Sequence, residues 1–339
     1  MPPARPRADS RPSRRAFLAS AGAALLVAPR AVPAQPAAGK VRIGYLGTSS
    51  ASLERHLLDA FLERLQQHGY TEGQHISIEY RWADGHAERF PALAAELVGA
   101  NPSVIVTTGT PCTLAAMHAT TTIPIVMTSS LDPVRSGLVA SLARPGGNVT
   151  GFTILGPELE GKRLELLKQA VPKLTRVAVL WNPSNPGIAF NLEATEAAGR
   201  ALQVTVGPVM EVRRTEELEH AFATIAQARP DALEVLADRS LLAARTQIVQ
   251  FAGARRLPAM YPYGEYVDAG GLMSYAPNNV ELVRGAATYV DKILKGAKPA
   301  TLPVQEPTKF DLVINLKTAK SLGLRIPQSL QLRADRLIQ

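Results

Sequence analysis

Strand and helix patterns alternate twice along this chain, on either side of the stretch ARPGGNVTGF at residues 143–152. In both halves, short apolar runs typical of strands alternate with helical runs, in which apolar residues recur every three or four positions. Within the stretch, Pro145 ends the preceding helix because proline lacks the N–H that a helix interior needs. Gly146 and Gly147 permit backbone angles that are closed to other residues. We interpret the stretch as a crossing between two α/β lobes, and infer that a ligand is held between them.

The expected elements follow the order strand, helix, strand in each half. In the first half we expect strands at 41–46, 75–82, 103–107 and 123–127, and helices at 52–68, 91–97 and 111–119. In the second half we expect strands at 176–181, 204–212, 231–236 and 257–261, and helices at 158–171, 189–202, 215–228 and 241–255. A helix at 280–295, a strand at 310–315 and a helix at 316–322 complete the chain. This alternation predicts an α/β fold of two Rossmann-like lobes with parallel sheets and right-handed crossovers.

The order of the elements also predicts how the chain is divided. We expect a first lobe of residues 40–152 plus 278–303, a second lobe of residues 153–272 plus 308–339, and hinge crossings near 150–157, 270–278 and 303–308. Three connections make a multi-strand hinge that resists twisting but lets the lobes open and shut, as ligand clamps do.

Residues 1–34 have the features of a targeting segment. Ser13-Arg-Arg-Ala-Phe-Leu18 resembles the twin-arginine export motif, and an apolar run at 19–28 and the small-residue site AVPA at 31–34 follow it. The apolar run is shorter than the roughly 20 residues that a permanent membrane helix needs. We predict a twin-arginine-type signal peptide, cleavage near Gln35, and a soluble periplasmic protein.

Composition and missing motifs exclude several classes of function. The formal net charge is +8, but six arginines and one aspartate fall in residues 1–34, and removing those five net charges leaves +3. We therefore expect no nucleic-acid partner. The sequence GPELEGKR at 156–163 resembles a phosphate-binding loop, but Arg163 stands where a serine or threonine binds Mg²⁺. No dinucleotide fingerprint follows the first strand, and the six histidines have no metal-ligand spacing. We expect neither cofactor nor metal.

Polar residues gather where the predicted strands end, which is where parallel sheets bind ligands. These ends lead to helix N-termini, whose free N–H groups favour a carboxylate, although any one serine or threonine there can simply cap its helix. In the first lobe we expect the carboxylate to meet Thr48, Ser49, Thr110, Thr113 and Ser130. In the second lobe we expect Asn182, Ser184 and Asn185 to close over it. Candidates for pairing with an ammonium group are Asp132, Asp238 and Glu265, and candidates for an apolar wall are Tyr261, Tyr263 and Tyr275.

Four sequence motifs point to a known family. The run TKFDLVINLKTAKSLG at 308–323, followed by Ile326-Pro327, is similar to the C-terminal signature of one group of ABC transporter substrate-binding proteins. The segments ARPGGNVTG at 143–151, LWNPSNP at 180–186, and IPIV at 123–126 with DPV at 132–134 resemble the same group. The resemblance implies a type I periplasmic-binding fold and delivery of a solute to a membrane permease and an ATPase. Some members of the group bind aromatic amino acids.

We therefore expect a monomeric, exported solute-binding protein without enzymatic activity, for a small carboxylate or amino-acid-like ligand. One alternative is a periplasmic sensor module that signals to a histidine kinase or chemoreceptor. Another is a cleft enzyme, a racemase or hydrolase, with the single cysteine Cys112 as nucleophile. The neighbours of Cys112 supply no base for such chemistry.

Overall fold

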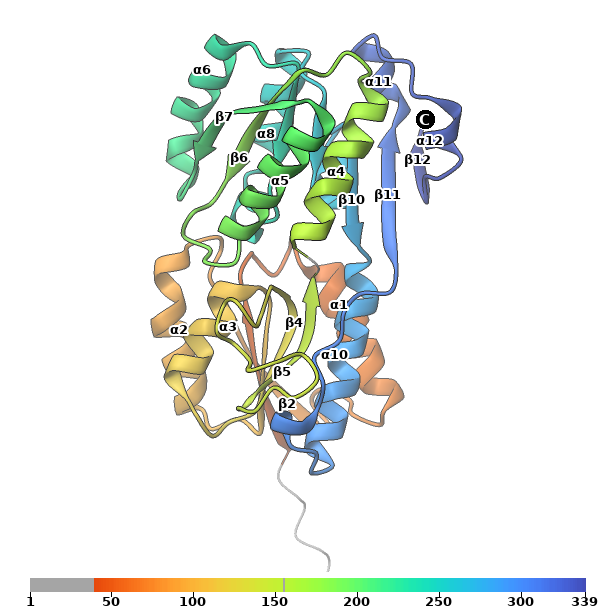
Figure 1. The fold of residues 1–339 in the computed structure, drawn as a ribbon. Coiled ribbons are helices and arrows are strands. Elements are labelled where there is room, and N and C mark those ends of the chain that lie inside the picture. The colour runs from red at the N-terminus through yellow and green to blue at the C-terminus, as the bar shows by residue number, and fades with distance from the viewer. Residues whose placement is uncertain (1–39, 155) are drawn as a thin grey trace, which may run out of the picture. The chain divides into compact units, whose positions relative to one another are not determined.

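The computed structural model describes residues 40–154 and 156–339, so the predicted signal peptide at 1–34 lies outside the described residues. These residues contain two sheets, of five and seven strands, and each sheet carries helices on both faces (Figure 1). The fold class predicted from the sequence, α/β with two parallel-sheet lobes of the type I periplasmic-binding class, is confirmed.

The first lobe contains the five-stranded sheet, in the order β2-β1-β3-β4-β5 with all neighbours parallel. Its elements are β1 (Val41–Gly47), α1 (Arg55–Gln67), β2 (Ile76–Trp82), α2 (Phe90–Gly99), β3 (Val104–Thr107), α3 (Thr110–Ala119), β4 (Ile125–Leu131), β5 (Val149–Ile154) and the late helix α10 (Asn279–Leu294). Strand β1 is apolar on both sides because both faces of the sheet are covered. Ile43 and Tyr45 pack toward α1 and α10, whereas Leu46 packs toward α2 and α3.

The second lobe contains the seven-stranded sheet, in the order β12-β11-β10-β9-β8-β6-β7. Its strands are β6 (Arg176–Trp181), β7 (Thr205–Glu211), β8 (Ala232–Val235), β9 (Ala259–Tyr261), β10 (Met273–Pro277), β11 (Phe310–Asn315) and β12 (Arg336–Ile338). Its helices are α4 (Pro157–Ala170), α5 (Ala189–Leu202), α6 (Leu218–Ala228), α7 (Arg239–Ala243), α8 (Arg245–Ala254), α9 (Gly264–Asp268), α11 (Leu316–Ser321) and α12 (Gln328–Gln331).

The structure corrects several sequence-based expectations. Strand β4 continues through 128–131, where we expected a loop, and its register with β5 shifts between Met127 and Ser130. The single helix expected at 241–255 is two helices, α7 and α8, which meet at Ala244. Strand β11 pairs antiparallel with β10, not parallel. The reason is topological: β10 runs out of the second sheet toward α10, and β11 runs back into it.

The chain passes between the two sheets three times, and the three passages are hydrogen-bonded to one another. The backbone N–H of Thr153 donates to the carbonyl of Gln305 at 3.0 Å, and the N–H of Gln305 donates to the carbonyl of Gly151 at 2.9 Å. The N–H of Asn278 donates to the carbonyl of Lys309 at 3.0 Å. The crossings therefore form one connected layer between the sheets. The residue limits predicted for the lobes stay a prediction.

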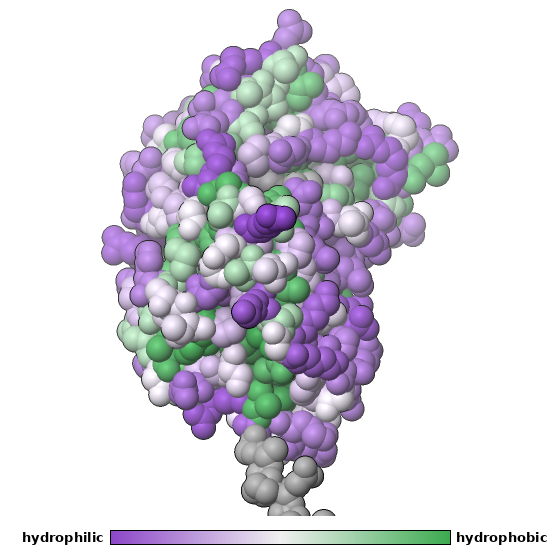
Figure 2. All heavy atoms as spheres, turned by 60° about the horizontal axis from the view of Figure 1, so that its bottom comes forward, coloured by the Kyte–Doolittle hydropathy of each residue, from purple (hydrophilic) through white to green (hydrophobic). Residues whose placement is uncertain are grey.

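Few large apolar side chains face solvent. Val134, 41% exposed, and Leu332, 79% exposed, are the large hydrophobic residues at the surface of the described chain. Figure 2 shows a face on which hydrophilic residues surround small apolar groups, some of them close to where the described chain begins. No helix within residues 40–154 and 156–339 combines the length and the apolar character needed to cross a membrane.

Candidate ligand-binding site between the two lobes

A small cavity lies where the carboxyl ends of strands from both sheets face one another. Its volume is about 20 Å³, which is room for about one water molecule and far less than an amino acid needs. In the first lobe the lining comes from the segments that follow β1 and β3 and from the ends of β4 and β5, and in the second lobe from the segments that follow β6, β8 and β9. The lining residues are Thr48, Gly109, Thr110, Pro111, Ser129, Leu131, Ile154, Asn185, Ala237, Asp238, Arg239, Ser240 and Tyr263. The two lobes are therefore closed on each other around this cavity.

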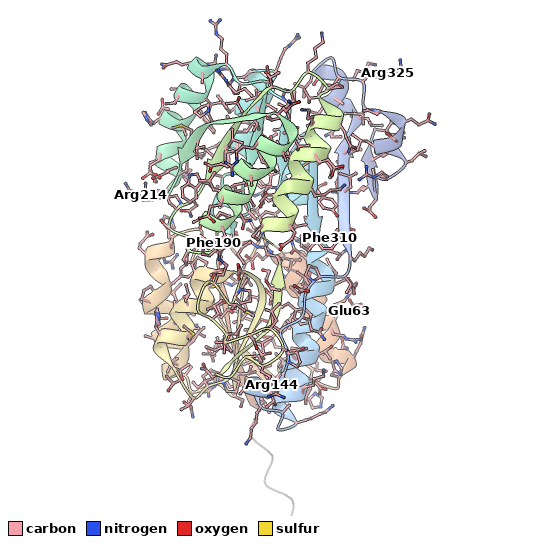
Figure 3. The ribbon with its side chains drawn as sticks, in the orientation of Figure 1. Glu63, Arg144, Phe190, Arg214, Phe310 and Arg325 are labelled. Carbon is pink, nitrogen blue, oxygen red and sulfur yellow. The ribbon has the colours of Figure 1, made fainter. Side chains whose placement is uncertain are left out.

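Direct contacts hold the lobes in this closed arrangement. The guanidinium of Arg135, in the loop after β4, lies 3.3 Å from the centre of the Phe190 ring on α5 and 3.7 Å from the Glu193 carboxylate. Phe190 lies near the junction of the lobes in Figure 3. Close by, a Cβ atom added to Gly187 would lie 2.8 Å from the Cβ of Leu131. The lobes approach each other closely on this side because position 187 has no side chain.

The hydroxyl groups predicted to meet a carboxylate already bond within the protein. Thr48 donates to the carbonyl of Thr108, and Thr110 accepts from the N–H of Leu131 at 2.8 Å. Thr113 lies 2.8 Å from the carbonyl of Gly109, to which it donates. Thr48 and Thr110 line the cavity, whereas Ser49, Thr113 and Ser130 are not among its lining residues. The hydroxyls of Thr48, Thr110 and Thr113 thus fix the loops of the first lobe, and the contact of the predicted residues with a ligand stays a prediction.

In the second lobe, Asp238 organises the loops that the sequence singled out. Its carboxylate accepts from the side-chain amides of Asn182 and Asn185, both at 3.1 Å, and from the N–H groups of Ser240 and Leu241 at 2.9 and 3.2 Å. Burial raises the pKa of Asp238, and the two asparagine bonds oppose that rise. Three of these donors meet Oδ1 and one meets Oδ2, so most of the acceptor capacity of Asp238 is used within the second lobe.

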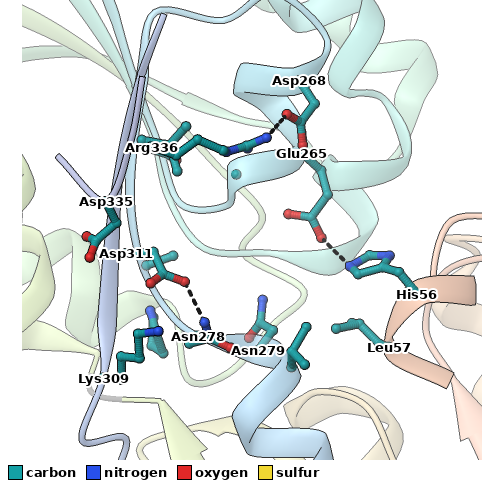
Figure 4. A pocket seen from close by; sticks show the side chains of 16 residues that line it. His56, Leu57, Glu265, Asp268, Asn278, Asn279, Lys309, Asp311, Asp335 and Arg336 are labelled. Atoms are coloured by element: carbon teal, nitrogen blue, oxygen red, sulfur yellow. Dashed lines mark hydrogen bonds and ion pairs between the residues drawn. The ribbon is translucent and has the colours of Figure 1, made fainter. Parts of the chain in front are cut away.

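Of the remaining predicted residues, only Tyr263 is among those that line the cavity. Ser184 is exposed, and the carboxylate of Asp132 accepts from the N–H of Arg135 at 3.1 Å. Glu265 lies 3.6 Å from His56 in a larger pocket of about 570 Å³ beside the hinge, shown in Figure 4. Among the tyrosines, Tyr263 lines the cavity, Tyr261 stacks on Tyr266 and Tyr275 stacks on Phe310.

Arg239 is the residue that the sequence argument missed. Its side chain is only 6% exposed, its Nε and Nη1 atoms have no hydrogen-bond partner, and it lies 4.9 Å from the Tyr263 ring. Burial lowers the pKa of Arg239, but its neighbours, Tyr263 and Glu54 foremost, outweigh burial and leave the pKa raised. An unpaired buried cation is costly, and an anion beside it removes that cost. The signal was its position, directly after Asp238 at the end of a predicted strand.

Cys112 lies in surroundings that disfavour a thiolate. Burial, opposed only in part by the neighbouring Thr48 hydroxyl, raises the pKa of the thiol to about 12. Its Sγ donates to the carbonyl of Thr108 at 3.0 Å. Nucleophilic catalysis needs the thiolate, so the site gives the enzyme alternative no support. The part of the chain that the structure describes also has no group of three or more metal-binding side chains.

Comparisons with known proteins agree with this geometry. The sequence profile of a family described as ABC transporter substrate binding protein matches residues 50–338. The chain is 26% identical, over 78% of its length and 76% of the relative, to a tyrosine-binding protein of Clostridioides difficile. The fold is similar to an ABC domain from Streptococcus pneumonia in complex with L-Trp, at 26% identity and a TM-score of 0.83, covering 88% of this chain and 100% of the other. A conserved domain protein from Vibrio cholerae gives 28% identity and the same TM-score, with 88% and 99% covered.

Proposed function

This chain belongs to the family of ABC transporter substrate-binding proteins, and from that premise we propose that it captures an L-amino acid between its two lobes in the periplasm. The family is one of soluble, non-enzymatic proteins that bind small molecules outside the cytoplasm and work with ABC permeases. In this proposal the protein delivers its ligand to a permease and an ATPase, after export directed by residues 1–34. The relatives that bind tyrosine and L-Trp make aromatic amino acids the first candidates.

The buried, unpaired guanidinium of Arg239 carries the proposal. It comes from the second lobe and reaches a cavity whose other wall is built by the first lobe. A guanidinium offers donors in a fixed fork that matches a carboxylate, and the hydrogen bonds are strengthened by both charges. A carboxylate bound here would satisfy Arg239 and link the two lobes. The apolar Leu131 and Ile154 and the ring of Tyr263 line the same cavity and offer a surface for the ligand side chain.

Ligand entry requires the lobes to separate. The closed cavity of about 20 Å³ is too small for an amino acid, whereas the three crossings leave a hinge about which the lobes can open. We infer that the ligand enters an open form and that a less tightly closed form than this one holds it.

Isothermal titration with the twenty L-amino acids tests this function. Wild-type protein is expected to bind at least one of them, with aromatic members strongest. Arg239→Gln should lose about 2–5 kcal/mol of binding free energy, because it removes one partner of a buried charge pair. Arg255→Gln, which changes an exposed arginine on the second lobe, is the matched control and should bind as wild type does. Folded wild-type protein that binds no amino acid, or an Arg239→Gln variant of undiminished affinity, would contradict the proposal.

A further inference from the structure

Glu54 is a buried carboxylate that the site described above does not use. It directly precedes α1 and is only 1% exposed. Its Oε1 accepts from the N–H of Ser49 at 3.3 Å, whereas its Oε2 is buried without any hydrogen-bond partner. A buried carboxylate oxygen without a partner is uncommon in folded proteins and calls for an explanation.

The unpaired oxygen of Glu54 shares its surroundings with the unpaired nitrogens of Arg239. Ser49 links the two residues, because its N–H donates to Glu54 and its hydroxyl donates to the carbonyl of Arg239 at 3.3 Å. The hydroxyl of Tyr45 is a third buried group there without a partner. Glu54 comes from the first lobe and Arg239 from the second, so closure brings two opposite charges together without a hydrogen bond between them.

The ionisation of both groups reflects this proximity. Burial is the largest influence on Glu54 and raises its pKa, and the Arg239 cation is the largest influence that opposes the rise. The same carboxylate helps to raise the pKa of Arg239. Each group therefore shifts the pKa of the other, yet each keeps polar atoms without a hydrogen-bond partner.

We propose that Glu54 binds the ammonium group of a ligand whose carboxylate is bound by Arg239, so that the site selects zwitterionic amino acids over simple carboxylic acids. This inference rests on the proposed function and assigns a residue to the recognition of the second charge. A zwitterion supplies a partner for both Arg239 and Glu54 and does not change the net charge of the site. A simple carboxylate satisfies Arg239 alone and leaves Glu54 unpaired beside an added negative charge, which is unfavourable in a buried site.

The other acids near the site are less suited to this role. Asp238 already accepts four hydrogen bonds, and Asp132 faces Arg135. Glu265 is partly exposed and pairs with His56. Among these carboxylates, Glu54 is the one that is buried and has an oxygen without a partner.

The test compares three amino acids with their deaminated counterparts by isothermal titration. The pairs are L-tryptophan with indole-3-propionate, L-tyrosine with 3-(4-hydroxyphenyl)propionate, and L-leucine with 4-methylpentanoate. Wild type should prefer at least one amino acid over its counterpart by roughly 10- to 100-fold, as expected for a hydrogen bond between charged groups. Glu54→Gln, which keeps an acceptor for Ser49, should abolish that preference by weakening the amino acid alone. Glu265→Gln is the control and should keep the preference, and thermal unfolding of each variant verifies its fold.

The outcomes separate this inference from the proposed function. Equal binding of both members of every pair by wild type, or an unchanged preference in Glu54→Gln, overturns the role of Glu54. Loss of all binding in Arg239→Gln would still support the proposed function in that case. If folded wild type binds none of the six compounds, this inference is contradicted, whereas the proposed function is contradicted only if none of the twenty L-amino acids binds.

Discussion

Glu234 on β8 is fully buried, and neither of its carboxylate oxygens has a hydrogen-bond partner. Arg163 on α4, the cation that acts on Glu234, donates to Glu160 at 2.6 Å, and the amide of Asn191 on α5 donates to the same Glu160 oxygen at 2.6 Å. Burial, followed by the negative charge of Glu160, raises the pKa of Glu234 well above its ordinary value of 4.5, and Arg163 offsets this only in part. One guanidinium neutralises one of the two carboxylates, and Glu234 is the one that stays protonated.

Replacement of Glu234 by glutamine should therefore change the pH dependence of stability. In wild type the folded state keeps a proton that the unfolded chain loses above pH 4.5, so the free energy of unfolding falls as pH rises through that window. Glutamine cannot ionise, and Glu234→Gln should gain stability relative to wild type between pH 5 and pH 8, by up to about 1.4 kcal/mol for each pH unit. Urea unfolding at both pH values measures this.

A second variant tests whether the change in pH dependence comes from the burial of Glu234 or from the loss of any carboxylate. Glu219→Gln removes an exposed carboxylate on α6 and should show the pH dependence of wild type. If the free energy of unfolding of Glu234→Gln instead falls below that of wild type as pH rises, Glu234 is ionised in the folded protein and paired with Arg163.

For single residues, the sequence predicted some of the side chains that line the cavity, but not which side chains lack a hydrogen-bond partner. It singled out Asp238 and Tyr263, which line the cavity, because they follow predicted strands. It missed Arg239 and Glu54, because their importance lies in the absence of a hydrogen-bond partner. That absence depends on which side chains the whole fold brings nearby, and a local pattern does not contain this information.

Among the elements, the first crossing depends on Gly151. Its φ of +127° lies outside the range that other residues readily adopt, and an added Cβ would lie 2.1 Å from the carbonyl oxygen of Met127 on β4. Strand β5 can pair this closely with β4 because position 151 has no side chain.

Gly151→Ala should destabilise the protein by about 2 kcal/mol or more, since it combines backbone strain with overpacking. Urea unfolding measures the change. Gly99→Ala is the control, because Gly99 ends α2 and an added Cβ there meets nothing within 4 Å. Equal stability of Gly151→Ala and wild type would show that the crossing tolerates a side chain.

Long elements were predictable because the pattern runs over many residues. The strand expected at 176–181 and the helix expected at 189–202 coincide with β6 and α5. Short elements such as α9 and β12 were missed, because five or three residues are too few to show a period. The break between α7 and α8 was missed because apolar residues continue on both sides of it.

For the whole molecule, the lobes can reach the closed form only if they can approach each other closely at Gly187. An added Cβ there would lie 2.8 Å from the Cβ and 3.1 Å from the carbonyl oxygen of Leu131 in the other lobe. The clash exists in the closed form alone, because separation of the lobes removes it. A side chain at position 187 should therefore shift the population toward the open form.

Gly187→Ala should weaken amino-acid binding roughly 10- to 100-fold, in line with the usual cost of overpacking, and should leave the free energy of unfolding close to that of wild type. Isothermal titration measures the affinity, and small-angle X-ray scattering of ligand-saturated protein should give a larger radius of gyration. Gly253→Ala on α8, where an added Cβ meets no neighbour, is the control. Unchanged affinity in Gly187→Ala would mean that the form that binds the ligand does not bring position 187 against Leu131.

The three passages between the sheets also affect when each lobe can fold during synthesis of the chain. The first lobe needs α10, which is synthesised after most of the second lobe, and the second lobe needs β11 and β12, which come last. Neither lobe is therefore built from one uninterrupted stretch of the polypeptide. The ribosome must synthesise α10 before the first lobe can complete its packing, and β12 before the second lobe can. A chain that ends before α10 leaves both lobes incomplete.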